Sequence, residues 1–305
     1  METHWKDWVA LSRPHFHSVG VLPFVLGLTL SWRIGNPINW PVFLLGVFGV
    51  ILIMLAADYG GETYDIREDS TTWSEGGNPF SGGSGMVIRG RISPQQAKRA
   101  SLTAFLAAIL LGIFLQFGLK TGPWTLPLGL TGAFAGYYYS IPPFRWVKRG
   151  FGELLIAFCY GWLPVAMAFY LQTGSFHPLV LWLSFPIGCT IFNVILLNEF
   201  PDYQGDSQSG KKNLVVRLGR DYASKIYGVV TLLAWIFLVL SLFAGAPVHL
   251  AILATPLYLM GGKIYRELQK GAYHDKHILR KLCGLNLLIN LGTTTLMILC
   301  VILWM

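Results

Sequence analysis

The sequence predicts an all-α integral membrane protein, and its hydropathy, its charge content and its long apolar stretches lead to that prediction. Mean hydropathy is +0.52 over 305 residues, 53% of the residues are hydrophobic, and only 12% are charged. A soluble domain carries about 25% charged residues. Because a helix needs about 20 mostly apolar residues to cross a bilayer, we expect nine transmembrane helices. They are placed at residues 16–32, 38–57, 100–119, 124–140, 152–172, 178–198, 224–245, 248–264 and 284–304.

The charges inside these nine segments support their placement, taken in chain order. The first four segments and the sixth contain no Asp, Glu, Lys or Arg. The fifth contains Glu153 at its second position, and the seventh contains Lys225 at its second position. The eighth contains Lys263 near its end, and the ninth contains no charged residue. The few charges therefore lie where a helix would leave the hydrocarbon core.

Two acidic motifs follow the second and the sixth predicted spans. The first is "AADYGGETYDIREDS", residues 56–70, and the second is "FPDYQGDS", residues 200–207. Since four spans separate them, both motifs are expected on the same side of the membrane. We therefore predict two four-helix repeats around a central cavity, plus a ninth helix. The chain is interpreted as one transmembrane domain, residues 1–305, with the first acidic motif at 58–69 and the second at 198–206.

Lysine and arginine are distributed unevenly over the predicted loops. The net charge is +8, and all but two of the 23 basic residues, Arg33 and Lys120, fall on one side of the membrane. This is the positive-inside pattern, so the N-terminus and the loops with the acidic motifs are expected in the cytoplasm of a multi-pass cell-membrane protein. Nucleic acid is not needed to explain the charge, and no nucleic-acid partner is expected.

The acidic side chains are spaced for a metal site. Positions 58, 62, 65 and 69 have the i, i+4, i+7, i+11 spacing of one helical stripe, and 202 and 206 repeat the i, i+4 step. Like charges repel strongly at a membrane boundary, and carboxylates bind Mg²⁺ together with substrate phosphates. The alternative is a solvated acidic face near a helix end. The predicted metal ligands are Asp58, Glu62, Asp65, Asp69, Asp202 and Asp206.

Basic residues near these acids suit a phosphate group, although the positive-inside bias alone also places bases here. Those predicted to bind substrate are Arg67, Arg145, Lys148, Lys211 and Lys212. The glycine-rich segment "NPFSGGSGMVIRG", residues 78–90, is interpreted as a lid or connector over the cytoplasmic opening. "HDKH", residues 274–277, is interpreted as an interhelical loop rather than a metal pair, and the four cysteines as packing residues.

Four segments together resemble the UbiA superfamily of intramembrane prenyltransferases, and the resemblance spans almost the whole chain. They are "SRPHFHSVGVLPFVLG", "ADYGGETYDIRED", "YYYSIPPFRWVKRGFGELL" and "NEFPDYQGDSQSGKKNLVVRLG". The resemblance implies nine transmembrane helices and transfer of a prenyl group from an allylic diphosphate to an acceptor, usually an aromatic ring, with Mg²⁺ required. It implies catalytic roles for Asp58, Asp65, Asp202 and Asp206, and substrate-binding roles for Tyr139, Ser140 and Asn198.

The second motif is most similar to the menaquinone branch of that superfamily. This branch prenylates 1,4-dihydroxy-2-naphthoate with loss of its carboxyl group. Other acceptors in the superfamily are 4-hydroxybenzoate, homogentisate, porphyrin-derived rings and glyceryl lipids. A cation-coupled transporter is the alternative from another class, since intramembrane acids also bind transported ions. Its acids should lie near the bilayer midplane, whereas these lie at span ends.

The first motif departs from the family pattern Asn-Asp-x-x-Asp-x-x-x-Asp. Ala57 stands in place of the asparagine and Gly61 in place of the middle aspartate, while Asp58 and Asp65 are kept. Glu62 lies one position along and one helical turn after Asp58. We therefore expect Glu62 to replace the missing ligand, the alternative being that it faces solvent or pairs with a base.

Overall fold

The computed structural model describes residues 5–74 and 77–303, and in these residues the chain is helical throughout, with no β-strand. An isolated bridge joins Asn78 and Ser81. The elements are α1 (Trp5–Leu11), α2 (Pro14–Arg33), α3 (Trp40–Tyr64), α4 (Ile66–Ser74), α5 (Pro94–Ile113), η1 (Phe114–Gly118), α6 (Thr125–Tyr137), η2 (Trp146–Lys148), α7 (Gly152–Ala157), η3 (Phe158–Trp162), α8 (Leu163–Thr173), α9 (Pro178–Gln208), α10 (Leu214–Leu218), α11 (Arg220–Phe243), α12 (Val248–Gln269), η4 (Ala272–His274) and α13 (Lys276–Ile302).

The predicted apolar segments fall in helices, with residue 304 outside the described residues. Six helical stretches are long and apolar enough to cross a membrane, and the chain is a multi-span membrane protein by that measure. They are Trp40–Tyr64, Pro94–Gly118, Gly152–Thr173, Pro178–Gln208, Arg220–Phe243 and Lys276–Ile302. The other three predicted spans lie in α2, α6 and α12, which do not meet that measure.

Side-chain caps define where several of these helices begin. The Asn39 side chain accepts the Val42 N–H at the start of α3, and Ser93 forms a capping box with Gln96 at the start of α5. Asp275 accepts two backbone N–H groups at the start of α13. Such caps satisfy N–H groups that have no partner within the helix. Helix α8 ends at Thr173 and is capped by Gly174, which has a positive φ of 67°.

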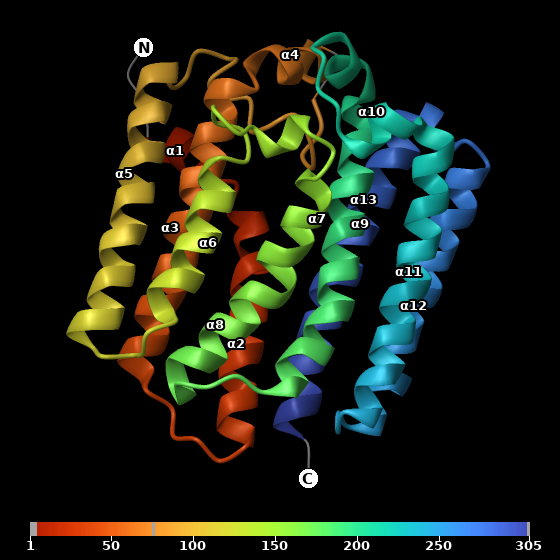
Figure 1. The fold of residues 1–305 in the computed structure, drawn as a ribbon. Helices are drawn as coiled ribbons and strands as arrows, with labels where there is room; N and C mark the ends of the chain where they lie inside the picture. The colour runs from red at the N-terminus through yellow and green to blue at the C-terminus, as the bar shows by residue number, and fades with distance from the viewer. Residues whose placement is uncertain (1–4, 75–76, 304–305) are drawn as a thin grey trace.

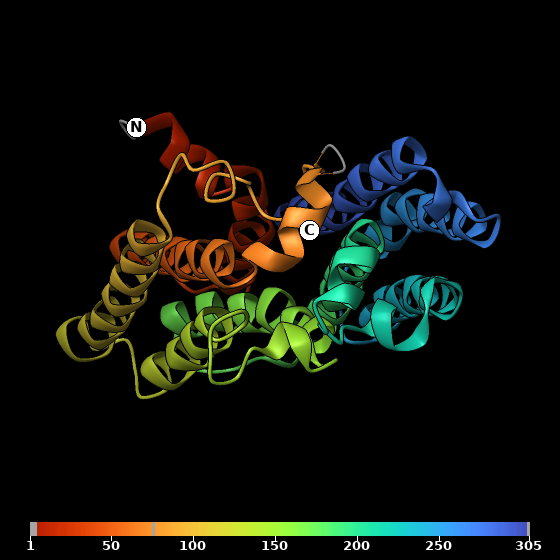
Figure 2. The same ribbon diagram turned by 90° about the horizontal axis from the view of Figure 1, so that it is seen from above.

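The long helices stand side by side, and the short helix α4 lies at the end where the chain begins (Figure 1). The described chain starts and finishes at opposite ends of this bundle (Figure 1). Viewed along the helices, α4 extends across the middle of the arrangement, between the N-terminal helices and α9 (Figure 2). Helix α9 packs against α7, α11 and α13 as well as α4. The second acidic motif is therefore carried by a central helix.

Buried polar groups link α9 to its neighbours α11 and α13. The Asn193 amide donates to Thr231 Oγ1 at 2.9 Å, and Tyr227 Oη donates to Asn286 Oδ1 at 2.9 Å. Asn286 in turn donates to the Asn193 carbonyl at 2.8 Å. Hydrogen bonds of this kind connect helices in a hydrocarbon environment, where burial of apolar surface alone gives little preference for one packing. They hold the middle of α9 in one orientation.

A π-helical turn, η3, interrupts the fifth predicted span. It joins α7 to α8, and its Gly161 lies against the backbone of Gly188 in α9, where an added Cβ would come within 2.7 Å of the Gly188 Cα. Turns of this type are frequent at functional sites. Here the turn carries two residues of the central cavity, Cys159 and Tyr160.

The first acidic motif does not form the continuous helical stripe expected from its spacing. Helix α3 ends at Tyr64, Asp65 is its C-cap, and α4 begins at Ile66. The change of direction lets α4 pack on α9 at Gly205, whose added Cβ would lie 2.6 Å from the Glu68 carbonyl oxygen. The stripe was therefore wrong as a description of one helix, but the break is what brings α4 to the second motif.

Candidate active site

One cavity of about 330 Å³ lies between α2, α3, α6, η3 and α9, and it has a polar end and an apolar end. The apolar end is formed by leucine and methionine side chains, among them Leu115, Leu128, Leu163 and Met167. The polar end contains five of the six predicted acidic ligands: Asp58, Glu62, Asp65, Asp69 and Asp202. An amphipathic ligand with an anionic head and an apolar tail would match this division.

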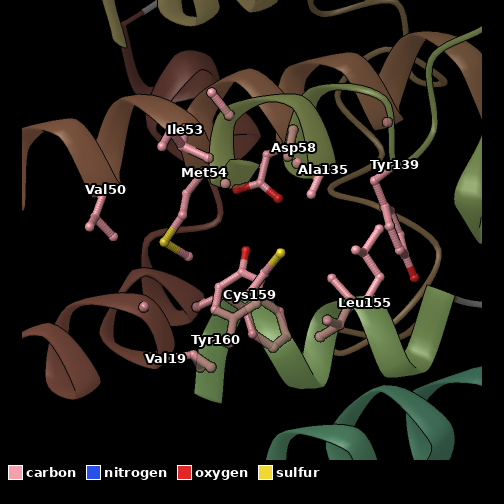
Figure 3. Close-up of a pocket in the computed structure, with 18 of the residues that line it drawn as sticks. Val19, Val50, Ile53, Met54, Asp58, Ala135, Tyr139, Leu155, Cys159 and Tyr160 are labelled. Atoms are coloured by element: carbon pink, nitrogen blue, oxygen red, sulfur yellow. The ribbon is translucent and has the colours of Figure 1, made fainter. Parts of the chain in front are cut away.

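Asp58 lines the cavity from α3, one helical turn before Glu62. Its carboxylate projects from α3 into the cavity and faces Cys159 and Tyr160 (Figure 3). Its Oδ2 atom is 3.9 Å from His17 Nε2, and both atoms are buried without a hydrogen bond in the described part of the chain. Buried polar atoms usually find a partner. Asp58 is therefore available to a ligand in the middle of the cavity.

Glu62 and Asp69 meet at the glycine-rich segment. The Ser84 N–H donates to Glu62 Oε1, and a Cβ added to Gly83 would lie 2.7 Å from Glu62 Oε1 and 2.8 Å from Asp69 Oδ2. Over the residues that the structure describes, the Asp69 carboxylate has no hydrogen-bond donor and no ion-pair partner. Burial, together with the nearby carboxylates of Asp202 and Asp65, raises the pKa of Asp69 well above its ordinary value.

Asp202 connects the second motif to the first. Its Oδ1 accepts the Thr72 hydroxyl at 2.5 Å, and its Oδ2 accepts the Gly82 N–H at 3.1 Å. Thr72 belongs to α4, so the contact follows from the packing of α4 on α9. The segment interpreted as a lid thus lies against the acids and bonds to them through backbone N–H groups.

Asp65 is paired with bases beside the cavity. Arg145 Nη2 donates to Asp65 Oδ1 at 2.7 Å and lies 3.5 Å from Glu68 Oε1, to which Lys148 also binds. Burial alone would raise the pKa of the Glu68 carboxyl, but the hydrogen bond from Lys148 and the charge of Arg145 lower it below its usual range. This pairing fixes the loop after α6 to the start of α4.

Lys211 is a buried cation among the acids. Its Nζ is 3.1 Å from Asp206 Oδ1, and the Asn213 amide donates to Asp206 Oδ2 at 2.7 Å. Burial alone would lower the pKa of Lys211, but the carboxylates of Asp206, Asp65, Asp202 and Asp69 raise it well above the usual value. Lys211 therefore stays charged and offsets part of the negative charge of the cluster.

The predicted site residues divide into those that line the cavity and those that do not. Lys211, Tyr139, Ser140 and Asn198 line it with the five acids, whereas Asp206, Arg145 and Lys148 lie behind the wall. Arg67 and Lys212 are exposed and lie outside the lining. A Cβ added to Gly61 would lie 3.7 Å from Ser140 Oγ and 3.9 Å from Asp65 Oδ2. Gly61 thus faces the cavity, and the role of Glu62 as its replacement stays a prediction.

Three charged residues of the site were missed by the sequence analysis. Arg13 lines the cavity, donates to the Phe80 carbonyl and lies over the Phe16 ring at 4.5 Å. Glu199 lines it from α9, and Glu153 lies against Glu199 from α7. Sequence signals were present for two of the three. Arg13 precedes a proline in a quoted segment, and Glu153 is a charged residue inside a predicted span, which makes it a functional candidate.

A metal-binding arrangement can be tested on the same atoms. Over the described ranges, no three His, Cys, Asp or Glu side chains converge closely enough to hold a metal ion. The "HDKH" segment likewise forms part of η4 and the start of α13. Nevertheless, Asp69 lacks a donor and faces Asp202, and oxygen-rich carboxylate sets are those that Mg²⁺ prefers. The chemistry of the donor set is therefore suited to Mg²⁺.

A family comparison decides what kind of protein this is. Residues 20–303 match the sequence model of the UbiA prenyltransferase family. The chain belongs to the UbiA prenyltransferase family. It is accordingly a prenyltransferase, as the resemblance of the motifs predicted, and the transporter alternative is set aside.

Similar UbiA proteins include enzymes of naphthoate prenylation. The chain is 28% identical over 229 residues to a 1,4-dihydroxy-2-naphthoate octaprenyltransferase of Bacillus subtilis, covering 75% of this chain and 69% of that protein. It is 24% identical over 296 residues to the protein of the same name from Haemophilus influenzae, covering 94% of each. These identities extend well beyond the acidic motifs.

Solved UbiA structures share the fold. A UbiA homologue from Aeropyrum pernix K1 superposes with a TM-score of 0.69 at 17% identity, covering 94% of this chain and 97% of that one. A homologue from Archaeoglobus fulgidus bound to GPP and Mg²⁺ gives a TM-score of 0.63 at 16% identity, covering 96% and 99%. The fold of this UbiA protein is thus the fold of its relatives.

The contact between Gly83 and the acids can be tested with a matched pair of variants. Gly83 and Gly90 both have positive φ, 64° and 69°, but an added Cβ at Gly90 meets nothing within 4 Å. Gly83→Ala should lower kcat/KM for prenyl transfer by about tenfold or more, because it displaces Glu62 and Asp69. Gly90→Ala has similar backbone strain without the displacement and should stay close to wild type. Equal losses in both variants would refute a role for the contact.

Proposed function

We propose that this enzyme transfers the prenyl group of an allylic prenyl diphosphate to 1,4-dihydroxy-2-naphthoate, with loss of the acceptor carboxyl group as CO₂, in menaquinone biosynthesis. The observation that carries the proposal is the division of a single cavity into an acidic end and an apolar end. The proposal is supported by two similar proteins named 1,4-dihydroxy-2-naphthoate octaprenyltransferase, whose alignments cover 75% and 94% of this chain. One prenyltransferase domain is proposed for residues 1–305.

Mg²⁺ is proposed as the cofactor at the acidic end. Asp69 and Asp202 are the first candidates to hold it because they face the cavity from different motifs, with Glu62, Asp65 and Asp58 near them. Bound there, Mg²⁺ would neutralise the charge that develops on the departing diphosphate. Asp206 is proposed to act through Lys211, which it holds in position. Arg67 and Lys212 would contribute to the approach of the anion, since they are exposed.

The protein side chains would orient the diphosphate and exclude water. Arg13 and Lys211 are the basic side chains that line the cavity among the described residues, and both can bind phosphate oxygens. Tyr139, Ser140 and Asn198 are proposed to contact the substrates from the wall formed by α6 and α9. Tyr160 presents an aromatic ring next to the apolar end, which suits a developing allylic cation.

An acceptor panel tests the proposed function directly. Purified protein in lipid nanodiscs is incubated with Mg²⁺, labelled geranylgeranyl diphosphate and one acceptor: 1,4-dihydroxy-2-naphthoate, 4-hydroxybenzoate or a glyceryl phosphate lipid. We expect a prenylated, decarboxylated product from the naphthoate alone, and none after chelation of Mg²⁺. Product from either of the other two acceptors, with none from the naphthoate, would overturn the proposed acceptor.

The membrane orientation is proposed as nine crossings with the N-terminus and the acidic motifs in the cytoplasm. The opposite ends of the described chain support an odd number of crossings (Figure 1). Ser175 and Ser207 are both exposed. Ser175 lies just before the start of α9, and Ser207 lies at its other end. In a variant without the native cysteines, Ser175→Cys should react with an impermeant maleimide in intact cells, and Ser207→Cys only after lysis. The reverse pattern would require the opposite orientation.

A further inference from the structure

Two glutamates, Glu153 of α7 and Glu199 of α9, form a buried carboxyl pair that no metal or phosphate role explains. Their side chains are 1% and 7% exposed. Glu153 Oε1 accepts the Leu214 N–H at 2.6 Å, whereas Glu153 Oε2 and Glu199 Oε2 are both buried without a donor from the described residues. The two carboxyl groups lie within hydrogen-bond reach of one another. The pair therefore has two buried oxygens without a donor among the described residues.

A shared proton follows from this geometry. Two carboxylates at hydrogen-bond distance in a buried site do not both ionise, because like charges repel strongly there. A carboxyl pair that holds one proton keeps one negative charge. This charge is available to accept a second proton.

Only one member of the pair opens on the cavity. Glu199 lines it beside Asn198, while Glu153 lies behind the wall. The charged and titratable groups that face the pair are Tyr139 in the loop after α6, Asp206 of the second motif, and Lys211, which follows that motif. A Cβ added to Gly152 would lie 3.3 Å from Tyr139 Oη, so the phenol is close to the start of α7. The pair is thus on the side of the cavity formed by α6, α7 and α9. Asp58 reaches the same cavity from a different helix, α3.

We propose that the Glu153–Glu199 pair is the proton acceptor for the aromatic acceptor, with Glu199 as the group that touches it. This inference rests on the proposed function and assigns a step of it. Glu199 accepts the proton of a ring hydroxyl, and the electron pair of that O–H bond enters the ring. The ring carbon bonds to the allylic carbon as the C–O bond to diphosphate breaks, and diphosphate leaves with that bonding pair.

The proton is returned in the same cycle. When the acceptor carboxyl group leaves as CO₂, its bonding pair re-forms the aromatic ring and places a negative charge on the ring oxygen. This oxygen takes the proton back from Glu199, so the pair needs no exchange with water during turnover. A buried pair that shares one proton and has a single side open to the cavity suits such a return.

Glu199→Gln tests the proposal, because glutamine keeps the size and the hydrogen bond to Glu153 but cannot accept a proton. We expect transfer to the naphthoate to fall by about 10²-fold or more, while affinity for the prenyl diphosphate, measured by titration calorimetry, is kept. Slow hydrolysis of the allylic diphosphate without acceptor should continue, since it needs no ionised ring. Parallel loss of hydrolysis and transfer would overturn the proposal, as would a Glu199→Gln enzyme with normal transfer.

Acceptor acidity separates proton acceptance from a structural role. Ring fluorination makes the naphthoate hydroxyls more acidic, so the Glu199→Gln defect should shrink along a fluorinated acceptor series, and Glu199→Asp should keep part of the activity throughout. A defect of the same size for every acceptor would overturn the proposal. Glu267→Gln, the same change at an exposed surface ion pair with Lys270, is the control.

The failure of this inference is distinguishable from failure of the proposed function. If the wild-type enzyme does not prenylate the naphthoate, the proposed function fails, and the variants are compared on the hydroxylated acceptor that it does use. If the wild-type enzyme prenylates the naphthoate and Glu199→Gln does so equally well, only the assignment of the pair fails.

Discussion

Replacing Asp202 by asparagine is expected to lower kcat/KM for prenyl transfer by about 10²–10³-fold, a loss typical of a group that stabilises charge in the transition state. Asp202 is the carboxylate at which the two motifs meet, through Thr72 of α4 and the Gly82 N–H. Asparagine has nearly the same shape, so the loss would come from the missing charge. Activity is measured over a Mg²⁺ titration, with thermal melting as the check on folding.

Thr72→Val is the control for the Asp202 variant. It removes the 2.5 Å hydrogen bond but leaves the carboxylate. We expect a smaller loss, about tenfold, in keeping with a single hydrogen bond to a charged group. If both variants lost the same amount of activity, the hydrogen bond rather than the charge would be the contribution of Asp202. An Asp202→Asn enzyme within tenfold of wild type would remove Asp202 from the proposed cation site.

Replacing Lys211 by methionine is expected to destabilise the protein by about 3–5 kcal/mol, the cost of removing one member of a buried ion pair. The Lys211 side chain is 10% exposed, and its ammonium group lies among four carboxylates. Without it, Asp206 loses its ion-pair partner, whereas Asp65 keeps Arg145. The melting temperature in detergent should therefore fall by several degrees. Mg²⁺ should raise it more in the variant than in wild type, because binding to the folded state stabilises that state.

Lys270→Met provides the comparison for Lys211→Met. Lys270 also pairs with a carboxylate, Glu267, at 2.7 Å, but its side chain is 70% exposed. Exposed ion pairs contribute about 0–1 kcal/mol, so this variant should melt close to wild type. The expectation would be contradicted if Lys211→Met had the melting temperature of Lys270→Met and the same rise with Mg²⁺ as wild type. The stability of the acidic cluster would then not depend on the Lys211 charge.

Much of the helix placement could be predicted from the sequence, because apolar length decides where a chain can cross a bilayer. Spacing also pointed to the acids of both motifs, five of which line the cavity, while Asp206 lies outside its lining. Position 61 shows the limit of that approach. The pattern predicted that Glu62 replaces the missing aspartate. Glu62 and Gly61 both line the cavity, and a Cβ added to Gly61 would face Asp65 and Ser140. Spacing along the chain does not say which side of a helix end faces the cavity.

The pairing of charges could not be predicted, since it depends on tertiary packing. Five bases were assigned to phosphate because they were basic and close in sequence. In the structure Arg145 and Lys148 bind Asp65 and Glu68 instead, because α3 stops at Tyr64 and turns α4 toward the loop after α6. Glu199 was overlooked although it is three residues before Asp202. Its importance depends on Glu153, a partner from a different helix, and no local pattern predicts such a contact.

The π-helical turn η3 affects how relatives of this chain should be aligned. A turn closed by i→i+5 hydrogen bonds contains one more residue than a turn closed by i→i+4 bonds, which corresponds to about 100° of rotation in a regular helix. A relative with a regular helix here would need a one-residue gap between 157 and 163. Without the gap, residues aligned on one side of the turn would face the cavity, and those aligned on the other would face a neighbouring helix. The turn therefore sets the direction in which Tyr160, one of its five residues, leaves the helix.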